Sequence, residues 1–324
     1  MQTKELHGIG PDAKKKLVYV GPSEGFEAIE SECPRDWHIS NSLPTPEALS
    51  GELKDAIALV DASMRVRIDD SILGKNPPLR IISTATTGSD HIDMQAVAKK
   101  GIVVRTLKED SDFLNEITPA AELTWALVLA VARQIPKAAD HVRESRWVRE
   151  EFPGIMLNQK TLGIVGCGRI GSWVARYGEA FGMWVIGYDP YREQWPALIQ
   201  RKSLEEVVAS SDVLTIHVHL NPETRKLLSK NLLDTVKPGA IIVNTSRSGV
   251  IDEAALLAGL KSGRLSGVGL DVLEGEPEIA NNALVDYARS HRNLIITPHC
   301  GGYSPDAVKL VCRRAAEKIF LLEK

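Results

Sequence analysis

The chain has 324 residues, of which 44% are hydrophobic, and a formal net charge of −3. This length allows two domains with full cores, and the small net charge gives no indication of a nucleic-acid or membrane partner. The polar residues 1–16 lack the apolar segment of a signal peptide. None of the four cysteines forms a Cys-x-x-Cys pair, so we expect no disulfide framework, no metal site and a cytoplasmic location.

The first third of the chain alternates short β-branched segments with helical patterns. Strands are predicted at residues 17–20, 57–60, 80–84 and 102–105, and helices at 46–53 and 93–100, with glycines at the junctions. This alternation is typical of parallel strands joined by helical crossovers.

A long helix is predicted from residue 118 to about 146. Thr118 is a suitable N-cap, Pro119 fits the first helical position, and Glu122 places a negative charge in the first turn. Apolar residues continue to Ile135. We expect this helix to be long enough to bridge two domains.

The strand–helix alternation resumes at residue 161 and is more hydrophobic. Six strands are predicted, at residues 162–165, 184–188, 213–218, 241–244, 268–271 and 294–296. Six strands with intervening helices suffice for a doubly wound, dinucleotide-binding domain. The amphipathic pattern from 305 to about 322 predicts one final helix that packs back on the first domain.

A glycine-rich turn follows the first of these six strands. Gly166, Gly168 and Gly171 form a G-x-G-x-x-G motif between an apolar strand and a helical segment. Gly166 permits the tight turn, Gly168 permits close approach of a pyrophosphate, and Gly171 permits close helix–strand packing. The phosphates would bind at the N-terminus of the helix.

An acidic residue stands where such a motif requires one. Asp189 ends the next predicted strand, 18 residues after Gly171. Its carboxylate is suited to the ribose hydroxyls of the adenosine and would repel a 2′-phosphate. The alternative is that Asp189 only begins an Asp-Pro turn. The order strand, turn, helix, strand and acid favours NAD binding over that alternative.

Three candidate catalytic residues follow predicted strands of the same domain. Arg247 follows residues 241–244, Glu276 comes after 268–271, and His299 follows 294–296. Arginine can grip a carboxylate and an adjacent carbonyl oxygen, and histidine can exchange a proton near neutral pH. A carboxylate beside histidine would stabilise its charged form. Each residue alone could equally be a surface or loop residue, but their shared position favours hydride-transfer chemistry on a keto acid.

Taken in order, these motifs resemble the D-isomer-specific 2-hydroxyacid dehydrogenase family, with the phosphoglycerate dehydrogenase-like group nearest. The resemblance rests on Gly166–Gly171 with Asp189, on residues 244–249 and 269–272, on Glu276-Pro277, and on residues 297–302. The loop of residues 86–93 is also of the family's type.

The resemblance implies an α/β fold of two doubly wound parallel-sheet domains. Residues 115–297 would form a Rossmann NAD domain, inserted in a flavodoxin-like substrate domain of residues 1–114 and 298–324. The site would lie in the cleft between the domains. The family habit also implies a homodimer. Trp147 could then lie in the subunit interface, or be an ordinary core residue.

The resemblance also implies roles for individual residues. Arg247 would bind and polarise the substrate, His299 would exchange the proton, and Glu276 would support His299. The substrate carboxylate would meet the backbone N–H groups of Thr87 and Gly88. The remaining residues would bind NAD: Gly166, Gly168, Arg169, Ile170, Gly171, Asp189, His217, Thr245, Ser246, Asp271 and Gly301. The partner would be a small 2-hydroxy or 2-keto acid.

The resemblance does not fix which acid is the substrate. Phosphoglycerate enzymes tend to have an arginine near the position of Ala62, and here Asp61 stands beside it. A phosphate would then depend on Arg65 or Arg67 turning inward. Formate dehydrogenases share the fold but have glutamine in place of Glu276. A non-enzymatic alternative is an NAD-binding, corepressor-like regulatory protein.

Overall fold

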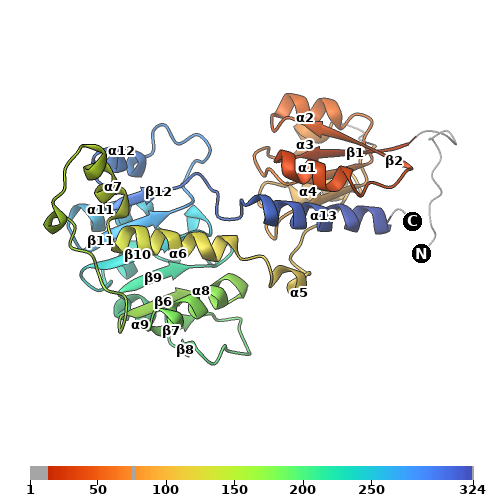
Figure 1. Cartoon of the computed structure of the whole chain (residues 1–324). Helices are drawn as coiled ribbons and strands as arrows, with labels where there is room; N and C mark the ends of the chain where they lie inside the picture. The colour runs from red at the N-terminus through yellow and green to blue at the C-terminus, as the bar shows by residue number, and fades with distance from the viewer. Residues whose placement is uncertain (1–13, 75–77, 323–324) are drawn as a thin grey trace. The chain divides into compact units, whose positions relative to one another are not determined.

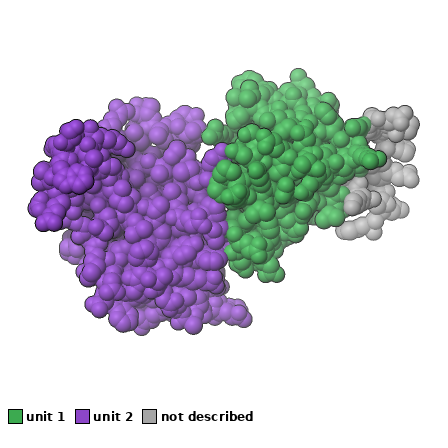
Figure 2. Space-filling view, viewed as in Figure 1, with its two compact units in different colours: residues 1–117, 304–324 green, residues 118–303 purple. Residues whose placement is uncertain are grey.

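The computed structural model describes residues 14–74 and 78–322, and the chain divides into two compact units (Figure 2). Unit 1 comprises residues 1–117 and 304–324, and unit 2 comprises residues 118–303. The boundaries expected from the sequence lie a few residues earlier at both junctions. His299 therefore belongs to unit 2, together with Arg247 and Glu276, and not to the other unit.

Unit 1 contains a five-stranded parallel sheet in the order β2-β1-β3-β4-β5. Its strands are β1 (Lys15–Val20), β2 (Trp37–Ser42), β3 (Ala58–Asp61), β4 (Ile81–Thr84) and β5 (Val103–Arg105). Its helices are α1 (Ser23–Glu30), α2 (Pro46–Glu52), α3 (Asp70–Leu73), α4 (Met94–Lys99), α5 (Ser111–Leu114) and α13 (Pro305–Leu322). This is the flavodoxin-like order that we predicted, with its switch point between β1 and β3.

The C-terminal helix α13 completes the core of unit 1, as predicted. Its apolar face packs with β1 and α1 in one buried cluster (Figure 1). The approach is close, because a Cβ at Gly25 of α1 would lie 2.6 Å from Sγ of Cys312. A second apolar cluster, which includes α2 and α4, contains Leu59 and Ile82 of β3 and β4. The sheet is therefore covered on both faces, as parallel sheets require.

Unit 2 contains a seven-stranded parallel sheet in the order β12-β11-β10-β9-β6-β7-β8. Its strands are β6 (Thr161–Val165), β7 (Trp184–Tyr188), β8 (Gln200–Arg201), β9 (Val213–Ile216), β10 (Ala240–Asn244), β11 (Leu265–Leu270) and β12 (Leu294–Ile296). Its α-helices are α6 (Pro119–Ala132), α7 (Ile135–Arg143), α8 (Arg169–Ala180), α9 (Leu204–Ser210), α10 (Lys230–Leu233), α11 (Glu253–Lys261) and α12 (Ala283–Ser290). Strand order reverses between β6 and β9, so the predicted Rossmann arrangement is confirmed and its switch point lies there.

The single long helix predicted from residue 118 to about 146 is wrong. Helix α6 ends at Ala132, Gln134 adopts a left-handed conformation with φ 51°, and α7 starts at Ile135. Pro136 lies in the first turn of α7. Proline has no N–H and its ring clashes with the preceding turn, so it starts a helix readily but does not continue one.

Two further differences concern strand ends and exposure. The strand predicted at residues 213–218 is shorter, because β9 stops at Ile216, so His217 lies beyond it. Trp147, on the segment after α7, has 88% of its surface exposed and is not a core residue. Within residues 14–74 and 78–322, no helix combines the length and apolarity needed to cross a membrane.

Candidate functional site

Three neighbouring strands of unit 2 end in register at one edge of the sheet. Asn244 of β10 pairs with Leu270 of β11, which pairs with Ile296 of β12. Adjacent strands lie about 4.8 Å apart, so the segments after them emerge side by side. Arg247, Glu276 and His299 stand on these three segments. Sheet register thus brings the predicted catalytic residues to one edge of unit 2.

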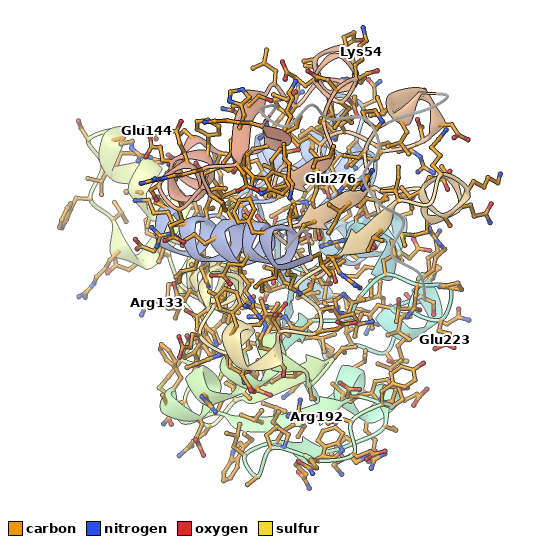
Figure 3. The ribbon with its side chains drawn as sticks, turned by 90° about the vertical axis from the view of Figure 1, so that its right-hand side faces the viewer. Lys54, Arg133, Glu144, Arg192, Glu223 and Glu276 are labelled. Carbon is orange, nitrogen blue, oxygen red and sulfur yellow. The ribbon has the colours of Figure 1, made fainter. Side chains whose placement is uncertain are left out.

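His299 and Glu276 form an ion pair. Nδ1 of His299 lies 2.8 Å from Oε1 of Glu276, and the two side chains are 34% and 31% exposed (Figure 3 labels Glu276). An ionised carboxylate only accepts hydrogen bonds, so Nδ1 is the donor. The other ring nitrogen, Nε2, remains to exchange a proton with a ligand. This arrangement provides a positioned acid–base group at the strand ends.

Asp271 holds the loop that carries His299, a role that the sequence analysis missed. The residue is buried, with 1% of its surface exposed. Its Oδ1 accepts hydrogen bonds from Oγ1 of Thr297 at 2.6 Å and from the N–H of Cys300 at 2.9 Å, and its Oδ2 accepts from the N–H of Gly301 at 2.7 Å. The N–H of His299 donates to the Asp271 carbonyl at 2.9 Å. A buried carboxylate directly after a strand was the available signal, since such a group requires partners.

Arg247 lies in a turn closed by the buried side chain of Asn244. Oδ1 of Asn244 accepts from the N–H and the hydroxyl of Ser246 at 3.0 and 2.7 Å, while Nδ2 donates to the Arg247 carbonyl at 2.9 Å. Nη1 of Arg247 donates to the Ser246 carbonyl at 2.8 Å. Thr245, in the same turn, shares a 2.7 Å hydrogen bond with the hydroxyl of Thr124 in α6. The guanidinium is therefore held at the strand end by local hydrogen bonds.

The glycine motif lies at the switch point, between β6 and α8. Gly166 has φ 91°, a conformation that favours glycine. A Cβ at Gly171 would lie 2.2 Å from the Gly166 carbonyl oxygen, whereas a Cβ at Gly168 would have no atom within 4 Å. Gly168 is the N-cap of α8 and, having no side chain, makes no capping hydrogen bond to the first N–H groups of the helix. The open space at residue 168 therefore faces a helix N-terminus, which suits a phosphate.

Arg169 and Ile170 form the first turn of α8, beside this space. Burial lowers the pKa of the Arg169 guanidinium, although arginine stays charged in proteins. A half-buried cation at a helix N-terminus adds to the local preference for an anion.

Asp189 joins the glycine motif to a surface hollow. Its Oδ2 accepts from the Cys167 N–H at 3.0 Å and its Oδ1 from the Tyr191 N–H at 3.0 Å. The hollow, of about 460 Å³, is lined by Asp189, Tyr191, Arg192, Glu193 and Gln194 (Figure 3 labels Arg192). Asp189 therefore contacts the glycine loop as well as its own turn, and it borders this open hollow.

His217 follows β9 on the opposite side of the switch point. Its N–H donates to the Val165 carbonyl at 2.8 Å. Its Nε2 is buried and has no hydrogen-bond partner within residues 14–74 and 78–322. Burial lowers the pKa of the imidazole to about 3, so the ring is neutral at pH 7. The His217 ring therefore places an uncharged side chain beside the glycine motif.

Thr87 and Gly88, in unit 1, follow β4 on a partly exposed loop. The Thr86 hydroxyl donates to the Gly88 carbonyl at 2.8 Å, and the Leu107 N–H donates to the Thr86 carbonyl at 2.9 Å. These bonds fix the backbone of the loop at the carboxyl edge of the sheet of unit 1.

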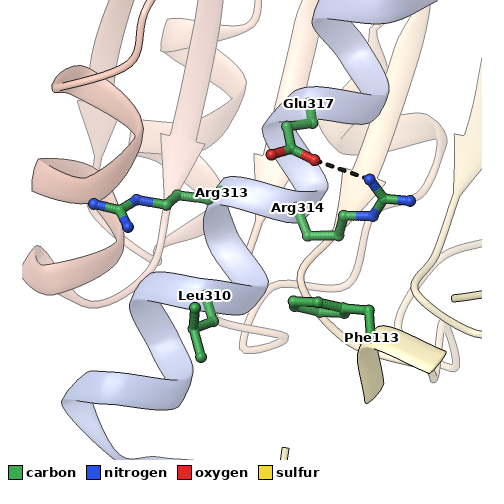
Figure 4. Close-up of a pocket in the computed structure, with 5 residues that line it drawn as sticks. All are labelled: Phe113, Leu310, Arg313, Arg314 and Glu317. Carbon is green, nitrogen blue, oxygen red and sulfur yellow. Dashed lines mark hydrogen bonds and ion pairs between the residues drawn. The ribbon is translucent and has the colours of Figure 1, made fainter. Parts of the chain in front are cut away.

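A second hollow, of about 390 Å³, lies on α13 in unit 1. It is lined by Phe113, Leu310, Arg313, Arg314 and Glu317 (Figure 4). Arg314 is paired with Glu317 and Asp110, and Arg313 with Glu32. Their charges are already compensated, so this hollow does not mark the site of chemistry. Across the described parts of the chain, no group of three or more His, Cys, Asp or Glu side chains could hold a metal ion.

Comparison with known proteins places the chain in a family. Residues 125–301 match the family model described as "D-isomer specific 2-hydroxyacid dehydrogenase, NAD binding domain". D-3-phosphoglycerate dehydrogenase of Methanocaldococcus jannaschii is 38% identical over 279 residues, which is 85% of this chain and 51% of that protein. The human protein of the same name is 38% identical over 264 residues, or 81% and 48% of the two chains. The chain thus spans about half the length of these curated relatives.

Solved structures are similar to this chain over nearly its whole length. The TT0316 protein from Thermus thermophilus has a TM-score of 0.83 and 33% identity, covering 95% of this chain and 97% of that one. D-lactate dehydrogenase from Aquifex aeolicus, complexed with NAD and lactic acid, has a TM-score of 0.81 and 29% identity, covering 94% and 95%. With more than half of its length matched by the family model, the chain belongs to the D-isomer specific 2-hydroxyacid dehydrogenase family.

Proposed function

We propose that this protein is an NAD-dependent oxidoreductase that interconverts a D-2-hydroxy acid and its 2-keto acid. The observation that carries the proposal is the 2.8 Å pair of His299 and Glu276, on the same unit as the glycine motif. A positioned acid–base pair is needed to exchange the proton of the hydroxyl group. The names of the relatives above support the same class of reaction.

The residues around the glycine motif fit NAD. Gly168 leaves room for the pyrophosphate, and the N-terminus of α8 with Arg169 and Ile170 provides donors and positive potential. Asp189 borders a hollow of about 460 Å³ and would accept hydrogen bonds from the ribose hydroxyls. Gly301, Thr245, Ser246 and His217 complete the proposed NAD-binding set, and Asp271 shapes it through the loop of residues 297–301.

The proposed mechanism assigns one task to each residue. When bound, NADH supplies the hydride that adds to C2 of the keto acid. Arg247 binds the substrate carboxylate and polarises the C2 carbonyl. His299 gives a proton from Nε2 to the carbonyl oxygen, and Glu276 stabilises the imidazolium through Nδ1. In the oxidation direction the same nitrogen accepts the proton. Thr87 and Gly88 are proposed to bind the substrate carboxylate through their N–H groups, on the strength of the family resemblance.

The test compares His299→Ala with a matched control, His38→Ala, which removes an exposed histidine of β2. NADH oxidation with a panel of 2-keto acids and NADH binding by fluorescence are measured for both. We expect His299→Ala to lose turnover while it keeps NADH binding, and the control to match wild type. Wild-type protein that binds NADH but turns over no acid would instead favour the regulatory alternative.

We also propose a homodimer formed through unit 2. The segment that includes α7 and the residues after it exposes several large apolar side chains: Ile135, Val142, Trp147, Val148 and Met156. Exposed apolar groups gathered on one segment are typical of a subunit interface. Trp147→Glu should convert a dimer to a monomer in light scattering, and an unchanged mass would refute this interface. A cytoplasmic location is proposed because all four cysteines are free.

A further inference from the structure

A buried carboxylate occupies the carboxyl edge of the sheet in unit 1. Asp61 is the last residue of β3 and is 0% exposed. Strand β3 borders the switch point of this sheet, where doubly wound folds bind ligands. The same edge carries the loop with Thr87 and Gly88, which follows the neighbouring strand β4. Asp61 therefore lies at the part of unit 1 to which the proposed function assigns the substrate.

The carboxylate is held firmly in place. Its Oδ1 accepts from the Ser63 N–H at 2.8 Å, the Ser63 hydroxyl at 3.0 Å and the Met64 N–H at 3.1 Å. Its Oδ2 lies 3.0 Å from Nε2 of His91, whose side chain is 10% exposed. This is the distance of a salt bridge, which is a charged pair only with His91 protonated, and neither atom has a hydrogen-bond partner within residues 14–74 and 78–322. A buried carboxylate needs such compensation.

The pair also ties together the two loops of this edge. The Ala85 N–H donates to the Asp61 carbonyl at 2.9 Å, and the Ile68 N–H donates to the His91 carbonyl at 2.8 Å. The loop after β3 and the loop after β4 are thus joined at the backbone and at the side chains. Any ligand held by the second loop lies near a fixed negative group or, with His91 protonated, near a neutral pair.

The loop after β3 carries two arginines that could receive a phosphate. Arg65 and Arg67 are exposed, and they flank the buried Val66. Nε of Arg67 lies 4.0 Å from Oδ2 of Asp69. Helix α1, which starts beyond β1 at the same edge, has Glu24 in its first turn. A phosphate dianion requires arginine, lysine or an open helix N-terminus. The N-terminus of α1 has no side-chain cap but carries Glu24, so carboxylates stand both there and at the end of β3.

We propose that Asp61 and His91 form a specificity-determining pair that makes the enzyme favour 2-keto acids with an uncharged C3 substituent over those with a C3 phosphate. This inference rests on the proposed function, because it assumes that the loop of Thr87 and Gly88 holds the substrate. The pair acts through charge and loop position and takes no part in proton exchange.

The experiment uses hydroxypyruvate and its 3-phosphate, two acids that differ by the phosphate alone. The ratio of kcat/KM for the two acids is measured with NADH for wild type, Asp61→Asn and Asp55→Asn. Asp55 precedes β3, at the opposite end of the same strand, and its side chain is 73% exposed. We expect wild type to favour hydroxypyruvate, Asp61→Asn to shift the ratio toward the phosphorylated acid by about tenfold, and Asp55→Asn to leave it unchanged.

A second variant guards against misfolding. His91→Asn leaves the carboxylate without a cationic partner, so it should shift the ratio in the opposite direction. Because the ratio compares two acids on one variant, a loss of folded protein cancels from it. A wild type that prefers the phosphorylated acid, or a ratio unchanged in both variants, would overturn the inference.

Binding separates this failure from a failure of the proposed function. Calorimetric titration of the two acids into protein saturated with NADH needs no turnover. Preferential binding of hydroxypyruvate that weakens in Asp61→Asn, without turnover, would refute the dehydrogenase function and keep the specificity pair. Turnover of both acids without discrimination would refute the specificity pair and keep the dehydrogenase function. Binding of neither acid would refute the specificity pair and the dehydrogenase function together.

Discussion

Gly168 and Gly171 belong to the same motif, yet the structure assigns them opposite sensitivities to an added methyl group. At Gly171, a Cβ would lie 2.2 Å from the Gly166 carbonyl oxygen and 3.1 Å from Cγ2 of Ile164. Overpacking of this kind costs about 1–3 kcal/mol, and a contact with backbone belongs at the upper end. The better helix propensity of alanine returns about 1 kcal/mol. Gly171→Ala should therefore destabilise unit 2 by about 2 kcal/mol.

Gly168→Ala should instead weaken cofactor binding and leave the fold intact. A Cβ at Gly168 has no neighbour within 4 Å, and its φ of −69° is open to any residue. The expected change in unfolding free energy is below about 1 kcal/mol, since alanine is a slightly poorer N-cap but also restricts the unfolded chain. The methyl group occupies the space proposed for the pyrophosphate. We therefore expect the Kd for NADH to rise at least about tenfold, which corresponds to a loss of about 1.4 kcal/mol of binding free energy.

The assay pairs thermal unfolding without cofactor with NADH fluorescence titration. A loss of about 2 kcal/mol lowers Tm by roughly 4–8 °C for a unit of this size, so Gly171→Ala should be well resolved from wild type. Gly168→Ala should unfold within about 3 °C of wild type. A Gly168→Ala protein that binds NADH with the wild-type Kd would refute the phosphate assignment.

Four further predictions concern acidic residues. Glu276→Gln should lower kcat about tenfold, because roughly 1.4 kcal/mol of imidazolium stabilisation is lost; an unchanged kcat would remove its role. Asp271→Ala leaves the N–H groups of Cys300 and Gly301 unpaired, so denaturant titration should show a loss of about 3 kcal/mol, together with reduced turnover. Asp189→Ala should relax the preference for NADH over NADPH in kcat/KM, and unaltered discrimination would contradict the ribose assignment. Burial raises the pKa of Asp110, but hydrogen bonds from Lys318 and Arg314 outweigh it, and the pKa is lowered. Its stabilisation is therefore present above about pH 4 and lost at lower pH; Asp110→Asn should lower Tm at pH 7 and have little effect at about pH 2.

The sequence predicted those elements whose hydrophobic pattern has a single structural interpretation. Strands such as β6 and β10 are buried along most or all of their length, and each gives a continuous apolar segment. The order of these segments, with the glycine motif and Asp189, was sufficient to predict the doubly wound fold of unit 2, whereas the flavodoxin-like fold of unit 1 was implied by the family resemblance. The His299–Glu276 contact was also predicted, because both residues follow strands of the same sheet.

Other features depend on tertiary contacts that periodicity does not reveal. Strand β2 was missed because it is an edge strand in which only Trp37 and Ser42 are buried, and the two-residue β8 gives no pattern. The break at Gln134 did have a signal, since Pro136 cannot continue a helix, but the apolar residues on both sides concealed it. The bonds of Asp271 to residues 297–301 join segments that lie far apart in sequence, and no local pattern records them.

The position of α13 has a consequence for biosynthesis. Residues 305–322 supply Val308, Cys312, Ala315, Ala316 and Ile319 to the core beneath β1 and α1. On the ribosome these side chains emerge after all of residues 118–303, so unit 2 can complete its fold while unit 1 still exposes an apolar face. A nascent chain paused before residue 305 should therefore present unit 1 to chaperones and proteases as an unfinished domain.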